Sequence, residues 1–272
     1  MQRYVIQPGS KFKLDDIDPA ETGDFDHRNG GEEESRLKTG KIIAKLDDLQ
    51  ERLYAGADRS LLIVLQGMDT SGKDGVIKHV MSGVNPQGCR VSSFKTPTFE
   101  ETSHDFLWRV HHEAPPKGYI GIFNRSHYED VIFPRVHDQV SGEDVEKRFR
   151  QINEFERLLV QNKTSILKFF LHISKDEQRQ RLQERADDPK KHWKFKITDV
   201  RERKFWETYQ KAFRDMIRET STKHAPWTVV PANHKWYRDY VVGKSVVRAL
   251  EDMKIPYPSG PQDIDFKKLR IR

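Results

Sequence analysis

A glycine-rich segment in the first third of the chain restricts the possible folds more than any other feature. Six mostly apolar residues, 61–66, precede it, and its sequence Gly67-Met-Asp-Thr-Ser-Gly72-Lys73 has the spacing G-x-x-x-x-G-K. The apolar run predicts a buried strand, and residues 75–81 predict a helix. A strand, this spacing and a helix, in that order, are typical of a phosphate-binding loop; an ordinary strand-to-helix turn is the alternative.

Phosphate binding by such a loop depends on backbone geometry and on charge. The glycines let backbone N–H groups surround a phosphate, the lysine adds a positive charge, and the following helix presents its positive N-terminus. We therefore predict that phosphate is bound by seven residues of this segment: Gly67, Met68, Thr70, Ser71, Gly72, Lys73 and Asp74.

The loop departs from its common form by carrying two carboxylates. Asp74 stands where a Ser or Thr usually follows the lysine, and Asp69 lies inside the loop. A carboxylate beside a phosphate is repelled unless a divalent cation lies between them. We therefore expect Asp69 to ligate Mg²⁺, with Mn²⁺ as a substitute, and leave the role of the Asp74 carboxylate open.

Composition limits the class of protein. A chain of 272 residues with 33% charged and 35% hydrophobic residues is long and apolar enough for one large domain with an extension. No apolar run approaches the roughly 18 residues of a membrane span, and the first residues lack the apolar core of a signal peptide. The lone Cys89 excludes an internal disulfide and favours a cytoplasmic protein with a buried, inert thiol. The net charge of +6 favours a polyanionic partner without distinguishing nucleic acid, nucleotide and inorganic polyanion.

Predicted strands and helices alternate along the chain without an internal repeat. The strands are predicted at residues 61–66, 90–95, 119–123, 164–173 and 227–231. The helices are predicted at residues 35–54, 75–81, 100–112, 142–162, 174–185, 199–219 and 237–253. This alternation predicts an α/β fold with a parallel five-stranded sheet and helices on both faces. Ligands of such a sheet bind outside the carboxyl ends of its strands.

The third predicted strand ends in a charged segment, Phe123-Asn-Arg125-Ser-His-Tyr-Glu129-Asp130. Acidic residues just past this buried strand occupy the place where a phosphate-loop kinase puts its second metal-binding carboxylate, and we assign Asp130 to it. Arg125 can reach phosphate oxygens with two hydrogen bonds. The alternative is a helix N-terminus whose acidic residues suit its dipole.

A basic stretch in the second half of the chain suggests a lid at about residues 178–200. Arg181 and Arg185 lie at i, i+4 on one face of a helix, followed by Lys190, Lys191, Lys194 and Lys196. Such a stretch can close over phosphates and exclude water, although a solvated charge run is the alternative. We expect the two embedded aromatic residues, Trp193 and Phe195, to pack at the base of the lid.

Together, the loop Gly67-x-Asp69-x-x-Gly72-Lys73-Asp74-Gly75, the segment at residues 123–130 and the basic stretch resemble the polyphosphate kinase 2 family. The resemblance runs from about Tyr4 to Pro258. It implies a P-loop kinase fold with a helical lid, and reversible, Mg²⁺-dependent phosphoryl transfer between inorganic polyphosphate and a nucleotide. The domains would be an extended N-terminal arm at 1–34, a kinase domain at 35–258 and a C-terminal tail at 259–272.

The resemblance also implies roles for particular residues. Asp69 and Lys73 would act at the phosphate loop, and a second group at the strand end: Arg125, Glu129 and Asp130. The lid arginines Arg181 and Arg185 would face the phosphate chain. Family members specific for ADP read F-D-R-S-W-Y-N-R at the third strand, whereas this chain has Asn124, Glu129 and Asp130. This difference is similar to the branch that accepts both AMP and ADP.

Asp69 has two possible roles, as a base toward the acceptor phosphate or as a metal ligand. Because the second pKa of a phosphate monoester is about 6, the acceptor is largely ionised at neutral pH, and we favour the metal ligand. The expected partners are polyphosphate and the adenine nucleotides AMP, ADP and ATP, with no membrane and no nucleic acid, in a cytoplasmic homo-oligomer.

Two other functions share parts of this pattern. A nucleoside monophosphate kinase with ATP as donor would share the sheet, loop and lid, but the richly basic lid suits a long inorganic anion better. A nucleic-acid-binding protein with a vestigial phosphate loop would fit the isoelectric point of about 9.2. Against it, acidic residues are interspersed with the basic ones and no recognition-module signature is present.

Overall fold

The computed structural model describes residues 2–26, 28–264 and 266–271. Its centre is a parallel five-stranded sheet with the strand order β2-β3-β1-β4-β5. The strands are β1 (Ser60–Gln66), β2 (Cys89–Ser93), β3 (Ile120–Asn124), β4 (Thr164–His172) and β5 (Trp227–Pro231). The predicted parallel five-stranded sheet is thereby confirmed.

Strand β1 lies in the middle of the sheet, and every one of its residues is buried. It pairs with β3 on one side (Leu65 opposite Asn124) and with β4 on the other (Leu65 opposite Phe169). A continuous apolar run is what a parallel strand covered on both faces requires. Because β2 and β3 lie on one side of β1 and β4 and β5 on the other, the carboxyl end of β1 is the switch point at which such sheets bind ligands.

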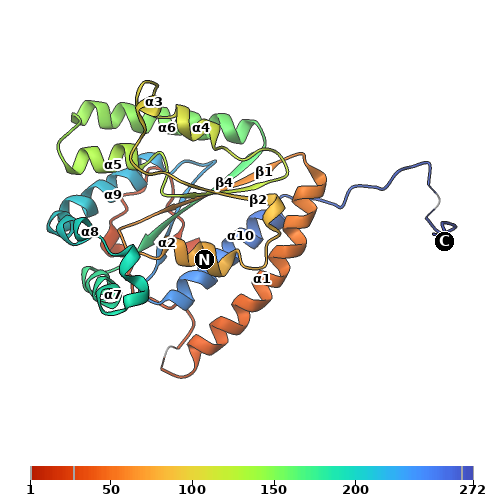
Figure 1. Cartoon of the computed structure of the whole chain (residues 1–272), viewed down its shortest axis with the longest axis horizontal. Coiled ribbons are helices and arrows are strands. Elements are labelled where there is room, and N and C mark those ends of the chain that lie inside the picture. The colour runs from red at the N-terminus through yellow and green to blue at the C-terminus, as the bar shows by residue number, and fades with distance from the viewer. Residues whose placement is uncertain (1, 27, 265, 272) are drawn as a thin grey trace.

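Helices cover both faces of the sheet, as predicted (Figure 1). One face carries α1 (Gly31–Gly56), α2 (Lys73–Val80) and α10 (Lys235–Asp252). The opposite face carries α5 (Glu129–Val136), α6 (Gly142–Gln161) and α9 (Trp206–Thr220), with the short helices α3 (Phe99–Thr102) and α4 (Trp108–His112) beside them. Among the described residues, no helix is long and apolar enough to cross a membrane.

The predicted lid consists of short helical pieces that follow β4. They are α7 (Lys175–Asp187), the 3₁₀ helix η4 (Pro189–Lys194), α8 (Ile197–Glu202) and the 3₁₀ turn η5 (Arg203–Phe205). Ser174 caps α7 by accepting a hydrogen bond from the N–H of Glu177, as the S-x-x-E spacing predicts. The helical lid is therefore present, and Figure 1 places α7 and α8 at one end of the molecule.

The N-terminal segment packs against the edge of the sheet. Val5 forms an antiparallel bridge with Thr228 of β5, and the N–H of Ile6 donates to the carbonyl of Trp227 at 2.8 Å. Its apolar side chains are buried in the core: Tyr4, Ile6, Phe12, Leu14, Ile17 and Phe25. The segment thus covers an otherwise open strand edge. Helix α1 begins at Gly31, and the predicted domain limits at residues 34 and 258 remain a prediction.

Two helices were predicted as continuous and are not. Residues 100–112 form α3 and α4 because the capping box of Thr98 and Glu101 starts α3, which ends at Thr102, and Asp105 then caps a new turn by accepting from the N–H of Leu107. Residues 199–219 are divided among α8, η5 and α9. Helix α5 was not predicted, since it has only eight residues and contains Pro134.

Candidate active site

The loop between β1 and α2 has the backbone conformation of a phosphate cradle. Three of its residues have positive φ: Gly67 (146°), Thr70 (69°) and Gly72 (104°). A Cβ on Gly67 would lie 2.7 Å from the carbonyl oxygen of Leu171, and one on Gly72 would lie 1.9 Å from Nη1 of Arg238. Both positions therefore need glycine, for conformation and for space.

Polar groups inside this loop are available for a ligand. Lys73 is buried, and its Nζ donates to the carbonyls of Gly67 (2.8 Å) and Met68 (3.2 Å), which occupy two of its three protons. Burial, together with the nearby charge of Arg125, lowers the pKa of Lys73 to about 8. The hydroxyls of Thr70 and Ser71 are buried without a partner among the described residues. Buried polar groups are normally satisfied, so this loop has the properties of a site that takes a polar ligand.

The carboxyl end of β3 brings a cation and two carboxylates to the same place. Arg125 has φ of 63°, its N–H donates to the carbonyl of Leu65 in β1, and its Nη2 lies 2.5 Å from Oδ1 of Asp69. Glu129, the first residue of α5, interacts electrostatically with Arg125, Lys73 and Asp69. Burial raises the pKa of Glu129, and the two neighbouring cations oppose this increase. Four predicted residues therefore meet at the ends of β1 and β3.

Asp130 lies elsewhere, which corrects the prediction that it ligates a metal together with Asp69. Both oxygens of its carboxylate accept hydrogen bonds from Nη2 of Arg109, at 3.0 and 2.9 Å. The pair lines a separate cleft of about 380 Å³ that also includes Phe106 and Arg148. Successive residues of a helix point about 100° apart, so Glu129 and Asp130 cannot both face the phosphate loop. Glu129 is the carboxylate that does.

The carboxylates near the phosphate loop determine whether this site can hold a metal ion. The described residues contain no group of three or more His, Cys, Asp or Glu side chains that could hold a metal ion. Mg²⁺, however, is usually bound by one or two carboxylates together with substrate phosphates. Asp69 and Glu129 fit that donor set, since Asp69 lies inside the loop that presents the phosphate-binding groups and Glu129 lies beside it.

The Asp74 side chain links three parts of the site. Its Oδ1 accepts from Asn124 at 2.8 Å, at the end of β3, and its Oδ2 lies 3.2 Å from Nζ of Lys194 in the lid. Burial raises the pKa of Asp74, but the hydrogen bonds from Asn124 and Lys194 outweigh this effect and hold the pKa below its usual range. The carboxylate thus forms a contact between the lid, the end of β3 and the phosphate loop.

The lid places one of its two predicted arginines toward the site. Nη1 of Arg185 lies 3.7 Å from Oδ2 of Asp199, whose pKa is raised by burial and by the charge of Asp69. The exposed lid lysines are Lys190, Lys191 and Lys196. Trp193 does not pack at the base of the lid: it is 78% exposed, so that prediction is wrong for Trp193.

Arg181 does not face the phosphate chain, contrary to the prediction. Its side chain is 5% exposed, and its guanidinium donates to four backbone carbonyls and to Glu177. Two of those carbonyls belong to the phosphate loop itself, Thr70 and Ser71. A guanidinium whose donors are all engaged cannot also bind the phosphate chain, so Arg181 supports the loop from behind.

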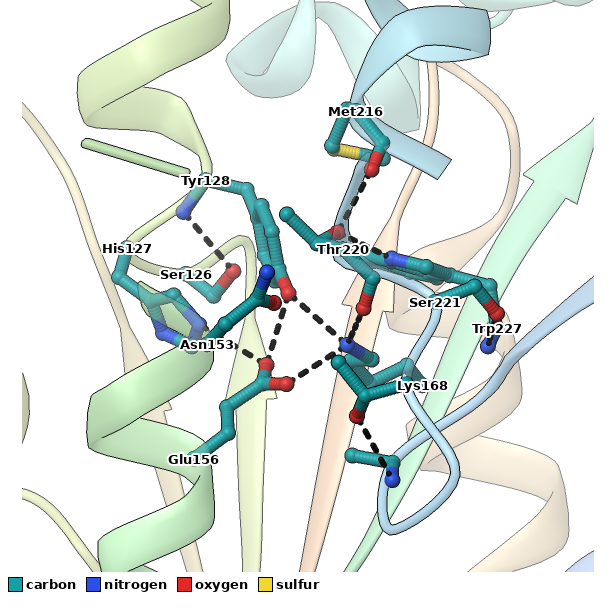
Figure 2. Close-up of polar contacts among 12 residues, drawn as sticks. Ser126, His127, Tyr128, Asn153, Glu156, Lys168, Met216, Thr220, Ser221 and Trp227 are labelled. Atoms are coloured by element: carbon teal, nitrogen blue, oxygen red, sulfur yellow. Dashed lines mark hydrogen bonds and ion pairs between the residues drawn. The ribbon is translucent and has the colours of Figure 1, made fainter. Parts of the chain in front are cut away.

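A buried polar network, missed from the sequence, anchors the segment between Arg125 and Glu129 (Figure 2). Nζ of Lys168 in β4 donates to Oε2 of Glu156 (2.6 Å), to the hydroxyl of Tyr128 (3.0 Å) and to the carbonyl of Thr220 (2.7 Å). The Tyr128 hydroxyl donates to Oε1 of Glu156 at 2.7 Å, and Nε2 of His127 lies 3.3 Å from the same oxygen. All these charged groups are buried. A lysine in an otherwise apolar strand was the signal in the sequence.

Comparisons with known proteins agree with this geometry. Residues 29–258 match the model of the family Polyphosphate kinase 2 (PPK2). The chain belongs to the polyphosphate kinase 2 family. Membership makes it a phosphotransferase that acts between polyphosphate and nucleotides, as the resemblance implied.

Three similar proteins span nearly all or most of the chain. An AMP/ADP-polyphosphate phosphotransferase of Meiothermus ruber is 50% identical over 95% of this chain and 96% of its own length. An ADP-polyphosphate phosphotransferase of Rhodopseudomonas palustris is 45% identical over 79% of each chain. The crystal structure of polyphosphate kinase 2 from Arthrobacter aurescens TC1 has a TM-score of 0.92 and 41% identity, covering 96% of this chain and 93% of that one.

Cys89 has no place in this site. Burial raises the pKa of its thiol to about 11, so the thiol is protonated at neutral pH and is a poor nucleophile. The expectation of an inert cysteine is consistent with this environment.

Proposed function

We propose that this polyphosphate kinase transfers the terminal phosphoryl group of polyphosphate to AMP and to ADP, reversibly and with Mg²⁺. The observation that carries the proposal is the meeting of Asp69, Lys73, Arg125 and Glu129 at the ends of β1 and β3. Two cations there suit two phosphate chains that approach each other, and two carboxylates suit a bridging metal. The relative from Meiothermus ruber, named for both AMP and ADP, supports acceptance of both nucleotides.

Phosphoryl transfer needs mostly positioning and neutralisation of charge. In this proposal the loop N–H groups and Lys73 hold the phosphoryl group to be transferred, and Arg125 stabilises the negative charge that spreads over its oxygens. Asp69 holds Arg125 in place through their 2.5 Å contact. The acceptor phosphate is already ionised at neutral pH, so no side chain has to remove a proton from it.

Asp69 and Glu129 are the residues that would hold Mg²⁺, together with phosphate oxygens of the substrates. When bound, the ion would neutralise charge on the transferring group. Glu129 has to be ionised for this role, and its raised pKa therefore limits activity at acidic pH. The charges of the two flanking cations oppose that increase and favour the ionised carboxylate.

The two substrates approach from opposite sides of the phosphate loop in this proposal. The lid side, with Arg185, Lys194 and the exposed lysines, takes the polyphosphate chain. The cleft of about 380 Å³ beside α3 and α4 takes the nucleoside, since it has both an aromatic residue, Phe106, and polar groups such as His104 in its lining. A homo-oligomeric state and a cytoplasmic location belong to the same proposal, and light scattering after size exclusion tests the first.

The experiment offers AMP and ADP separately, each with polyphosphate and Mg²⁺ and no other donor, and measures products by ³¹P NMR. The proposal predicts ADP from AMP, followed by ATP, and ATP from ADP. Formation of ATP from ADP without any conversion of AMP would restrict the enzyme to nucleoside diphosphates. Conversion of AMP only when ATP is present would favour a monophosphate kinase.

A further inference from the structure

All five N–H donors of Arg181 are engaged in hydrogen bonds. Its Nε donates to Oε1 of Glu177 at 2.7 Å. Its Nη1 donates to the carbonyls of Thr70 (2.9 Å) and Ser71 (3.1 Å) in the phosphate loop. Its Nη2 donates to the carbonyls of Ala232 (2.6 Å) and Asn233 (2.9 Å), which directly follow β5. An arginine offers five donors in a fixed planar fork, and here each of them has an acceptor.

These contacts set the orientation of two peptide groups in the loop. A trans peptide is planar, so its C=O and the following N–H point in opposite directions. Carbonyls of Thr70 and Ser71 that point back to Arg181 turn the N–H groups of Ser71 and Gly72 toward the opposite side. The N–H of Ser71 donates within the loop to Met68, at 3.0 Å, which leaves the N–H of Gly72 for an anion. An anion site of this kind depends on N–H groups that point at the ligand.

The charge of Arg181 is balanced on the rear side of the loop. Burial lowers the pKa of this guanidinium, the adjacent Glu177 carboxylate opposes that shift, and an arginine stays protonated in either case. The ion pair with Glu177 offsets part of the field that the cation would exert on a phosphate in front of the loop. Because all five donors of Arg181 are already engaged, its effect on a bound phosphate comes mainly from the geometry of the loop.

Other side chains support the same rear surface. Nε2 of Gln178 donates to the carbonyl of Asp69 at 3.3 Å. Arg238 of α10, paired with Asp239, lies so close behind the loop that its Nη1 would overlap a Cβ on Gly72. The first two turns of α7 are thus part of the support of the phosphate loop, together with α10.

We propose that Arg181 is a positioning residue, which presets the phosphate loop by connecting its carbonyls to the end of β5 and to the first turns of α7. It acts on the phosphoryl group through the backbone of the loop and makes no contact with polyphosphate. The part of the lid that contacts substrate then begins beyond Arg181, with Arg185. This inference rests on the proposed transfer reaction only where its test measures kcat and KM.

The test compares conservative and non-conservative changes at two arginines of the same helix. Arg181→Lys keeps the positive charge but cannot reach four carbonyls, whereas Arg181→Met removes both charge and donors. Arg185→Lys and Arg185→Met are the matched controls, one turn further along α7. Each variant is assayed for kcat and for the apparent KM of polyphosphate at several salt concentrations.

Positioning predicts that Arg181→Lys loses kcat nearly as much as Arg181→Met, by about 10- to 100-fold, because a 1 Å misplacement of catalytic groups has effects of this size. The dependence of KM on salt should stay as in the wild type, since no phosphate contact is lost. Arg185→Met, in contrast, should flatten the salt dependence and Arg185→Lys should preserve it. The proposal is overturned if Arg181→Lys keeps activity within about twofold while Arg181→Met flattens the salt dependence.

A binding measurement separates this inference from the transfer reaction. Isothermal titration calorimetry of the full-length proteins with pyrophosphate should show at least about tenfold weaker binding for Arg181→Lys than for the wild type. The melting temperature of each variant without ligand is the control that shows it is folded. Glu177→Gln serves if both arginine variants fail to fold. Its amide oxygen still accepts from Nε, so positioning predicts pyrophosphate affinity within about threefold of the wild type. Tighter binding with a steeper salt dependence in Glu177→Gln would show that the charge of Arg181 acts on phosphate directly, and would overturn the proposal.

Discussion

Removal of the Lys168 ammonium should destabilise this protein strongly, unless Glu156 is removed with it. Lys168→Met deletes three hydrogen bonds and leaves the Glu156 carboxylate buried without its cation (Figure 2). Glu156 keeps only the bonds from Tyr128 and His127. Breaking a buried ion pair in this way typically costs about 3–5 kcal/mol of the free energy of unfolding. At roughly 2–4 °C per kcal/mol for a chain of this size, the melting temperature should fall by about 6–20 °C.

The double variant Lys168→Met/Glu156→Met should be less affected than the sum of the single variants. It leaves the Tyr128 hydroxyl and the His127 N–H without their acceptor and the Thr220 carbonyl without its donor, at a cost of about 1–3 kcal/mol for each buried group. Two single variants at about 3–5 kcal/mol each would sum to about 6–10 kcal/mol, whereas the double variant should lose about 3–9 kcal/mol. A coupling energy of about 1–3 kcal/mol is therefore expected.

Urea denaturation of the wild type, both single variants and the double variant measures this coupling. The cost of Lys168→Met should also be smaller at pH 5 than at pH 8. In that variant burial without a cation raises the pKa of Glu156 above its unfolded value, so the stability gained by protonation is present at low pH and is lost as pH rises. Additive costs, or a cost of Lys168→Met independent of pH, would show that Lys168 and Glu156 are not coupled as a buried ion pair.

Three further predictions concern the reaction. Lys73→Met should lower kcat by about 10²–10³-fold, as expected for a lost charge at the transferring group. Steady-state rates measure this loss, and the circular dichroism spectrum is the control for folding. Because the pKa of Lys73 in the free enzyme is about 8, log(kcat/KM) should fall as pH rises through that value, and a flat profile to pH 10 would contradict it. Glu129→Gln should raise the Mg²⁺ concentration needed for half-maximal activity by at least about tenfold. Asp130→Asn, which alters the pair with Arg109, should leave that concentration within about threefold of the wild type; equal effects of the two variants would remove the distinction between the carboxylates.

The sequence predicted the features that depend on local pattern. Residues 60–66 form a buried parallel strand because their apolar run suits only a strand covered on both faces. The positive φ angles of Gly67 and Gly72 follow from the spacing of the loop. The position of Arg125 beside Asp69 follows from the rule that parallel strands end at one edge of the sheet.

Features that depend on packing were not predictable in this way. Arg181 and Arg185 share a helical face by spacing, but the spacing does not reveal that the phosphate loop and the end of β5 cover only Arg181. Glu129 and Asp130 are both carboxylates, and Arg109, which lies 21 residues before Asp130 in the chain, decides between them by binding Asp130. Lys168 is balanced by Glu156 of another element, and a single sequence does not show which helix faces which strand.

The proposed function requires polyphosphate itself to be the phosphoryl donor. Its most direct test is a ³¹P NMR time course of the purified protein with ADP, Mg²⁺ and polyphosphate of defined chain length, and with no other nucleotide. We predict that ATP appears as internal phosphates of polyphosphate are lost, one for one, because each transfer removes a terminal phosphoryl group and leaves the next phosphate as the new end. Lys73→Met should slow both changes by about 10²–10³-fold. ATP formation that requires no polyphosphate, or polyphosphate consumption that releases only orthophosphate, would show that polyphosphate is not the donor.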